Sequence, residues 1–111
     1  MLVNHNIVEC MDPERPATLS AEVHRVLREE LGFGGLIMTD DLEMEAIPQY
    51  TAGENPAPQA FLAGNDLLLC SEPGDSFHAL LKAVKAGEIA EEQLDASVLR
   101  ILEWKCSMGL L

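Results

Sequence analysis

Basic side chains are scarce in this sequence. Its 111 residues include 7 lysines and arginines against 19 aspartates and glutamates, which gives a formal net charge of −12. A chain this acidic repels phosphate backbones and anionic lipid surfaces. We therefore expect neither nucleic acid nor a membrane as a partner.

Long apolar runs are also missing. No window approaches the ~18 uninterrupted apolar residues of a membrane-spanning helix, and the start, MLVNHNIVEC, lacks the basic segment and apolar core of a secretion signal. The hydrophobic content of 48% nevertheless exceeds what a disordered tail carries. These features predict a folded, cytoplasmic protein.

Cysteines are few and unpatterned. Cys10, Cys70 and Cys106 are an odd number without Cys-x-x-Cys spacing, which favours reduced thiols over a zinc site or a disulfide framework. Cys70 ends a predicted strand, but no nearby residue in the sequence would activate its thiol, which disfavours a catalytic role.

Short apolar runs alternate with helical patterns along the chain. Strands are expected at residues 2–5, 35–39 and 66–70, and helices at 20–32, 58–63, 75–86 and 91–105. This order predicts an α/β fold with about three parallel β/α units plus a C-terminal helix. Because a complete TIM barrel needs about 250 residues, the chain is expected to be a single partial domain over residues 1–111. Three parallel strands leave two open edges, which is unfavourable for a monomer.

The most informative pattern is GFGGLIMTDDLEM at residues 32–44. A short apolar run bounded by glycines is typical of a buried parallel strand, and this one ends in two adjacent carboxylates, Asp40 and Asp41. Catalytic groups of α/β folds lie at the carboxyl ends of such strands, where the sheet holds the backbone of a side chain that points into a site. Asp40 is therefore the first candidate for a nucleophile.

Other interpretations of these carboxylates stay open at this point. Asp40 or Asp41 can cap the following turn, which is a frequent role of aspartate. The group Asp40, Asp41, Glu43 and Glu45 can bind a divalent cation, although it lacks the glycine and terminal glutamate of a calcium loop. A receiver-like phosphoacceptor is the weakest interpretation, because the aspartates are adjacent and the third strand, DLLLC, ends without a basic partner.

Histidines are the remaining candidates. His5 ends the first predicted strand, so it can face the same mouth as Asp40 if the strands are neighbours, either as a pocket residue or as a structural one. His24 lies on an exterior helix and His78 near the start of another. Both are expected to be solvated.

Four blocks, in order, resemble a known family. HNIVECMDPERPATLS, VLREELGFGGLIMTDDLEMEAI, AFLAGNDLLLC and ASVLRILEWKCSMGL are similar to the C-terminal part of the catalytic (β/α)8 barrel of glycoside hydrolase family 3, especially its bacterial β-N-acetylhexosaminidases. The resemblance covers nearly the whole chain. It implies a C-terminal fragment of such a barrel, a partial TIM barrel that uses neither a metal nor an organic cofactor.

The resemblance also implies roles for particular residues. The first aspartate of the family's T/S-D-D-L segment is the nucleophile, which assigns that role to Asp40. Asp41 and Met44 match neighbouring positions, and His5 matches a histidine at the end of the preceding core strand, so these three are expected to bind substrate. Glu43 departs from the pattern, because a small polar residue is frequent there.

A second departure concerns the general acid/base. The family's lysine-histidine segment and its histidine-containing loop are expected upstream of the part represented here, and the pattern K-H-F-P-G-H-G is absent. A retaining glycosidase needs a nucleophile and an acid about 5 Å apart. We therefore expect the isolated chain to be an inactive or weak enzyme.

The sequence thus predicts a fragment of a retaining β-N-acetylhexosaminidase. The complete barrel would hydrolyse terminal β-linked N-acetylglucosamine, an amino-sugar glycoside. The expected partner is a complementary N-terminal barrel half or further copies of the chain in a homo-oligomer. The alternative is a non-catalytic remnant or a self-assembling half-barrel module.

Overall fold

Three extended segments lie side by side and run in the same direction. The computed structural model describes residues 1–111. Strand β2 (Met38–Thr39) lies between β1 (Leu2–Val3), with which it pairs in parallel, and Leu67, which forms a parallel bridge with Met38. This arrangement confirms that the expected strands are parallel.

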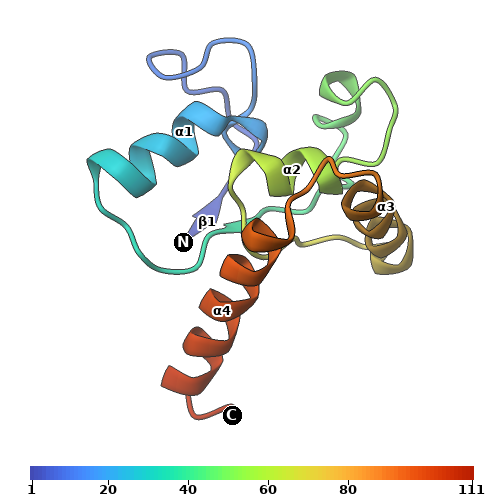
Figure 1. Cartoon of the computed structure of the whole chain (residues 1–111). Coiled ribbons are helices and arrows are strands. Elements are labelled where there is room, and N and C mark those ends of the chain that lie inside the picture. The colour runs from blue at the N-terminus through green and yellow to red at the C-terminus, as the bar shows by residue number, and fades with distance from the viewer.

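Helices alternate with these segments, so the chain is built from β/α units (Figure 1). In chain order they are the 3₁₀ helix η1 (Ala17–Leu19), α1 (Ala21–Arg25), the π-helix η2 (Val26–Glu30), the 3₁₀ helix η3 (Pro48–Tyr50), α2 (Ala57–Ala63), α3 (Pro73–Lys85) and α4 (Glu91–Ser107). The predicted α/β class, with about three parallel units and a C-terminal helix, is confirmed.

Local sequence signals explain several helix boundaries. The Ser20 hydroxyl accepts a hydrogen bond from the backbone N–H of Val23 at 3.2 Å and so caps α1, at the start of the helix expected over residues 20–32. Gly32, with φ of +65°, follows the same helical stretch. Helix α3 begins at Pro73 rather than near Asp75, because proline suits the first helical turn, where a backbone N–H has no intrahelical acceptor.

All three strands are shorter than the expected ranges 2–5, 35–39 and 66–70, because β1 and β2 contain two residues each. Of the five residues in DLLLC, only Leu67 forms a strand bridge. The backbone N–H of Leu69 donates to the hydroxyl of Thr39 at 2.9 Å rather than to a backbone carbonyl. The ladder therefore stops where a side chain replaces the main-chain acceptor.

The hydrophobic core is divided into three small clusters, and 24 of 111 residues are buried, so little of the apolar content is enclosed. The clusters comprise Leu19, Leu42, Ile47, Ala57 and Ala60; Val3, Ala17, Val23 and Ile37; and Phe61, Ala83 and Ile89. Many large apolar side chains stay exposed, among them Leu31, Phe77 and Leu99.

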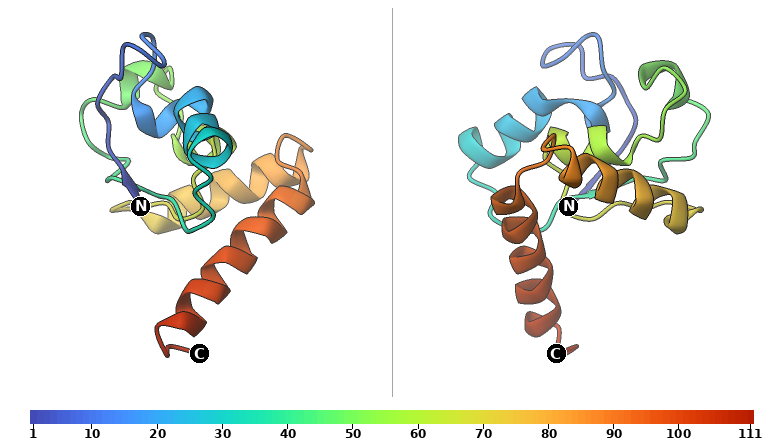
Figure 2. Two further views of the ribbon diagram at one scale, coloured as in Figure 1. Left: turned by 90° about the vertical axis from the view of Figure 1, so that its left-hand side faces the viewer. Right: turned by 45° about the vertical axis from the view of Figure 1, so that its right-hand side comes forward.

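Helix α4 projects from the rest of the molecule (Figures 1 and 2). Its first half contacts the body, where Gln93 donates to the carbonyl of Phe61 at 3.3 Å and Ser97 is buried. Farther along, Leu102 and Trp104 are exposed. None of the helices combines the length and the hydropathy needed to cross a membrane.

One buried carboxylate joins α4 to the body. The side chain of Asp66 is 1% exposed and accepts four hydrogen bonds. Its Oδ2 accepts from Arg28 Nη2 at 2.6 Å and from the backbone N–H of Ile37 at 3.0 Å, and its Oδ1 accepts from Arg100 Nη1 and the Ser97 hydroxyl, both at 2.8 Å. The charge is therefore compensated by two guanidinium groups, as burial requires.

His24 is buried, so the prediction that it is solvated is wrong. Its Nδ1 lies 2.8 Å from the carbonyl oxygen of Ser20 and its Nε2 3.0 Å from Oδ1 of Asn65. Asn65 donates in turn to the carbonyl of Thr18 at 2.8 Å. The turn after α2 passes close to this ring at Gly64, whose φ is +125° and where an added Cβ would lie 2.9 Å from the Cβ of His24.

Candidate active site

Asp40 directly follows β2, at the carboxyl end of the parallel segments. Its backbone N–H donates to the carbonyl of Val3 at 3.0 Å, so strand pairing holds the main chain up to this residue. The half-buried side chain accepts at Oδ1 from the backbone N–H of Asp41 at 2.8 Å. No group of the chain donates to Oδ2, which leaves this oxygen open to another reactant.

Both carboxylate oxygens of Asp41 accept hydrogen bonds from the chain. Its Oδ1 accepts from the backbone N–H of Glu43 at 3.0 Å, and its Oδ2 accepts from the hydroxyl of Ser71 at 3.1 Å. The Glu43 backbone donor is the main cause that holds the pKa of the Asp41 carboxyl below its usual range, and the Ser71 hydroxyl acts in the same direction. Asp41 therefore stays ionised beside Asp40.

Glu43 ties the loop after β2 to the start of α3. Its carboxylate accepts hydrogen bonds from the backbone N–H groups of Ser71 and of Glu72, the second at 3.2 Å. A negative charge at a helix N-terminus also interacts favourably with the helix dipole. The residue that departs from the family pattern thus fixes one loop of this site against the other.

His5 lies against the same turn, as the sequence predicted for neighbouring strands. Its Nε2 donates to the backbone carbonyl of Asp41 at 2.7 Å, and its Nδ1 lies 2.8 Å from the hydroxyl oxygen of Thr18. The end of the first strand is therefore joined to the Asp40–Asp41 turn. Contact of His5 with a sugar stays a prediction.

Met44 and Cys70 complete the set of sequence candidates. The backbone N–H of Met44 donates to the same Asp41 carbonyl at 3.3 Å, and the residue is 45% exposed. Cys70 lies near the same end of the sheet but lines a groove between α3 and α4, with its sulfur 4.0 Å from the carbonyl oxygen of Leu68. Asp40 does not line that groove.

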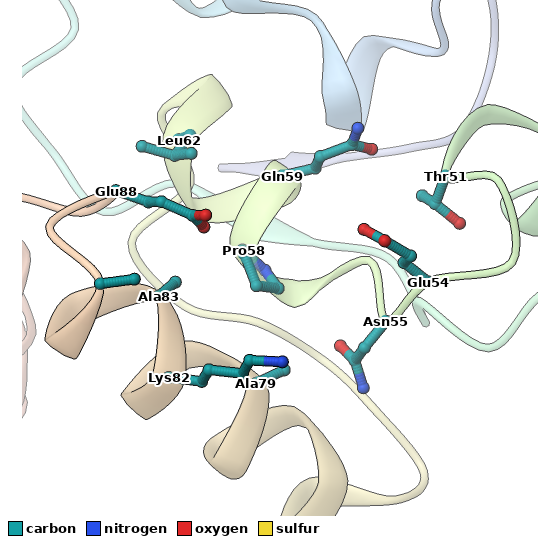
Figure 3. A pocket seen from close by; sticks show the side chains of 11 residues that line it. Thr51, Glu54, Asn55, Pro58, Gln59, Leu62, Ala79, Lys82, Ala83 and Glu88 are labelled. Atoms are coloured by element: carbon teal, nitrogen blue, oxygen red, sulfur yellow. The ribbon is translucent and has the colours of Figure 1, made fainter.

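A groove of about 480 Å³ lies between α2 and α3, with the loop before α2 at one end (Figure 3). Its charged lining residues are Glu54, Lys82 and Glu88. None of Asp40, Asp41, His5 or Met44 lines it. The candidate site at the strand ends is thus separate from this groove.

The carboxylates of the site do not converge as metal ligands. No three side chains of His, Cys, Asp or Glu lie close enough together to hold one ion. Those of Asp41 and Glu43 face hydroxyl and backbone N–H donors instead. These contacts give no support to the cation site, and the nucleophile role of Asp40 stays a prediction.

The fold and site define a class of protein: an α/β chain of parallel β/α units with a carboxylate directly after its central strand. Comparison with known families then identifies the group. Residues 1–104 match the family described as "Glycosyl hydrolase family 3 N terminal domain". The chain belongs to this family.

Named relatives and solved structures agree with this assignment. The chain is 32% identical over 97 residues to a β-N-acetylglucosaminidase/β-glucosidase of Cellulomonas fimi and 37% identical over 86 residues to a β-hexosaminidase of Nitrosomonas eutropha. These matches cover 86% and 77% of the chain but 17% and 24% of the relatives. A family 3 β-N-acetylglucosaminidase from a Paenibacillus species superposes with a TM-score of 0.86 at 37% identity, over 98% of this chain and 22% of that one. The chain is thus β-N-acetylglucosaminidase-like and spans about a quarter or less of these proteins.

Sequence reasoning missed the parts of the site that hold the candidates in place. Thr18 and Ser71 were not singled out, because each meets its partner only after the chain has folded back over 13 and 30 residues, respectively. The unusual Glu43 was the one available signal. A long acidic side chain, at a position where a small polar residue is frequent, can accept hydrogen bonds from a neighbouring loop.

Proposed function

We propose that this chain supplies the nucleophile of a retaining glycoside hydrolase that acts on terminal β-linked N-acetylglucosamine, and that Asp40 is this nucleophile. The observation that carries the proposal is the asymmetry of the Asp40 carboxylate. Oδ1 is held by the backbone N–H of Asp41, whereas Oδ2 has no protein donor. An aimed carboxylate with one free oxygen is what attack on an anomeric carbon requires.

The chemistry would follow two steps. Asp40 Oδ2 forms a bond to the anomeric carbon while the bond to the leaving oxygen breaks, and the leaving group takes the electron pair and a proton. Water then cleaves the glycosyl-enzyme with net retention. Asp41 and Met44, which flank the nucleophile, are proposed to contact the sugar.

The acid that protonates the leaving oxygen is proposed to come from outside residues 1–111. Within them, no Gly-rich loop carries a histidine after Asp40. Loss of general acid catalysis costs about 10² to 10⁴ in rate. We therefore expect slow or no turnover by the chain alone, and faster turnover when a complementary N-terminal barrel portion docks.

The test uses a substrate whose leaving group departs without protonation by an acid. We incubate the chain with β-N-acetylglucosaminyl fluoride and measure its intact mass, because fluoride leaves without a proton. Asp40 Oδ2 should displace fluoride and form an ester, and one glycosyl unit should be added to the mass. Peptide mapping should place this unit on Asp40. β-Glucosyl fluoride serves as the comparison that tests whether the acetamido group is recognised.

Variants separate the nucleophile from other carboxylates. Asp40→Ala should abolish the adduct, whereas Asp95→Asn, which changes an exposed carboxylate on α4, should leave it unchanged. An adduct that survives Asp40→Ala would remove Asp40 from the mechanism.

A second candidate function is non-catalytic self-assembly. It is supported by the open outer edges of β1 and of the segment at Leu67, together with the exposed apolar side chains of α3 and α4. Strand pairing or exchange between copies would cover these surfaces. Light scattering at micromolar concentration should then find at least a dimer, and a monomer that unfolds cooperatively would contradict this candidate.

A further inference from the structure

We propose that His5 is a positioning residue for the nucleophile, which acts through the main chain of Asp41 rather than on the sugar. The inference rests on the proposed role of Asp40. His5 Nε2 reaches the carbonyl of Asp41 at 2.7 Å, and the N–H of Asp41 is the group that holds Asp40 Oδ1 at 2.8 Å. The imidazole ring of His5 thus orients Asp41, and Asp41 orients the carboxylate of Asp40.

Hydrogen-bond chemistry leaves His5 little freedom for another role. A carbonyl oxygen only accepts, so Nε2 must carry the hydrogen in its bond to Asp41. The hydroxyl of Thr18 lies 2.8 Å from Nδ1 and 2.6 Å from the carbonyl oxygen of Asn4. Both ring nitrogens are therefore engaged within the chain, and neither is left for a sugar hydroxyl.

The support behind His5 is buried. Thr18 is fully buried, and its carbonyl accepts from the side-chain amide of Asn65 at 2.8 Å. Asn65 is itself 1% exposed and bonded to His24 at 3.0 Å. Hydrogen-bonded partners in a packed interior move little, so they fix the ring that they hold.

The far side of Asp41 is held as well. Its carboxylate accepts from the hydroxyl of Ser71 at 3.1 Å and from the backbone N–H of Glu43 at 3.0 Å. Asp41 is thus restrained at its carbonyl, its side chain and its N–H. Of the two oxygens of Asp40, only Oδ2 remains free to react, and misplacement of such a group by about 1 Å can cost 10²-fold in rate.

Two variants of His5 separate its contacts. In glutamine, the side-chain nitrogen is as many bonds from Cβ as Nε2 of histidine, so His5→Gln can still donate to Asp41. In asparagine, the nitrogen corresponds to Nδ1, so His5→Asn can reach Thr18 but not Asp41. His78→Asn, at an exposed histidine on α3, is the matched control.

The first measurement needs no sugar. Amide hydrogen exchange by NMR should show the Asp41 N–H exchanging about tenfold faster in His5→Asn, which is the effect of losing about one net hydrogen bond. His5→Gln should restore most of the protection, and His78→Asn should change nothing. The Leu42 N–H, which donates to the Leu69 carbonyl at 2.9 Å, is the internal reference for an intact sheet.

The second measurement is the rate of adduct formation with β-N-acetylglucosaminyl fluoride as a function of its concentration. We expect His5→Asn to lower the maximal rate about tenfold or more with an unchanged half-saturating concentration, and His5→Gln to recover it. A higher half-saturating concentration at an unchanged maximal rate would mean that His5 contacts the sugar, and would overturn the inference. Unchanged Asp41 protection in His5→Asn would overturn it too. If the wild-type chain forms no adduct but shows the expected exchange pattern, the restraint on Asp41 is supported and the proposed function of Asp40 fails.

Discussion

Removing the Asp66 carboxylate should destabilise the whole fold, although Asp66 lies outside the candidate site. In Asp66→Ala, Arg28 and Arg100 lose their shared acceptor, and the N–H of Ile37 and the hydroxyl of Ser97 lose theirs. These partners come from η2, the start of the β2 segment and α4. The substitution therefore weakens three connections at once.

The magnitude follows from the burial of the group. Breaking a buried ion pair by removing one partner costs about 3–5 kcal/mol. The side chains of Arg28 and Arg100 are 22% and 35% exposed, so water partly compensates them and the lower end, about 3 kcal/mol, applies. With an unfolding entropy of about 2.1 cal/mol/K per residue, a chain of this length should lose about 13 °C in Tm.

Thermal unfolding followed by circular dichroism, at one protein concentration, is the assay. Asp66→Asn keeps the shape but not the charge and should lie between wild type and Asp66→Ala. Glu22→Gln, which removes the exposed pair with Arg25 on α1, is the control and should leave Tm unchanged. A loss below about 4 °C in Asp66→Ala, or about 1 kcal/mol, would refute the reasoning.

Two further predictions concern stability. Gly64→Ala should lower the free energy of unfolding in urea by about 1–3 kcal/mol, because φ is +125° and the new Cβ would lie 2.9 Å from the Cβ of His24. The control is Gly74→Ala, where nothing lies within 4 Å of the added Cβ. Equal urea midpoints for the two variants would contradict the prediction. The folded pKa of Asp41 lies below 3.8, chiefly through the backbone N–H of Glu43, so its stabilisation is complete above 3.8 and is lost as pH falls through the folded pKa. The difference in urea midpoint between wild type and Asp41→Asn should therefore shrink between about pH 4 and pH 2, and a constant difference across that window would be the contrary result.

Local patterns were sufficient to predict the element order. The helical pattern predicted a helix that starts near Ser20, and the apolar runs before Asp40 and after Asp66 predicted parallel strands. Both are confirmed, because each depends on residues close together in the chain. The position of Asp40 at a strand end follows from the same local pattern.

Long-range polar partners were not predictable from one sequence. His24 was expected in solvent because its helix is exterior, but its partner Asn65 is 41 residues away. Asp66 was expected to be only the first residue of a strand. Arg28 and Arg100, which compensate its negative charge, are 38 and 34 residues away in the sequence. Spacing along the chain carries no signal for such contacts.

The attachment of α4 has a mechanical consequence. Asp66 holds this helix at Ser97 and Arg100, and the remainder up to Ser107 continues away from the body for about 10 Å at a rise of 1.5 Å per residue. The orientation of this segment therefore depends on the contacts that the Asp66 carboxylate makes with α4. A tilt of about 20° at these contacts would move the distal end by about 4 Å, given that rise. The direction in which the exposed Leu102 and Trp104 are presented is therefore set by a buried residue rather than by the surface that carries them.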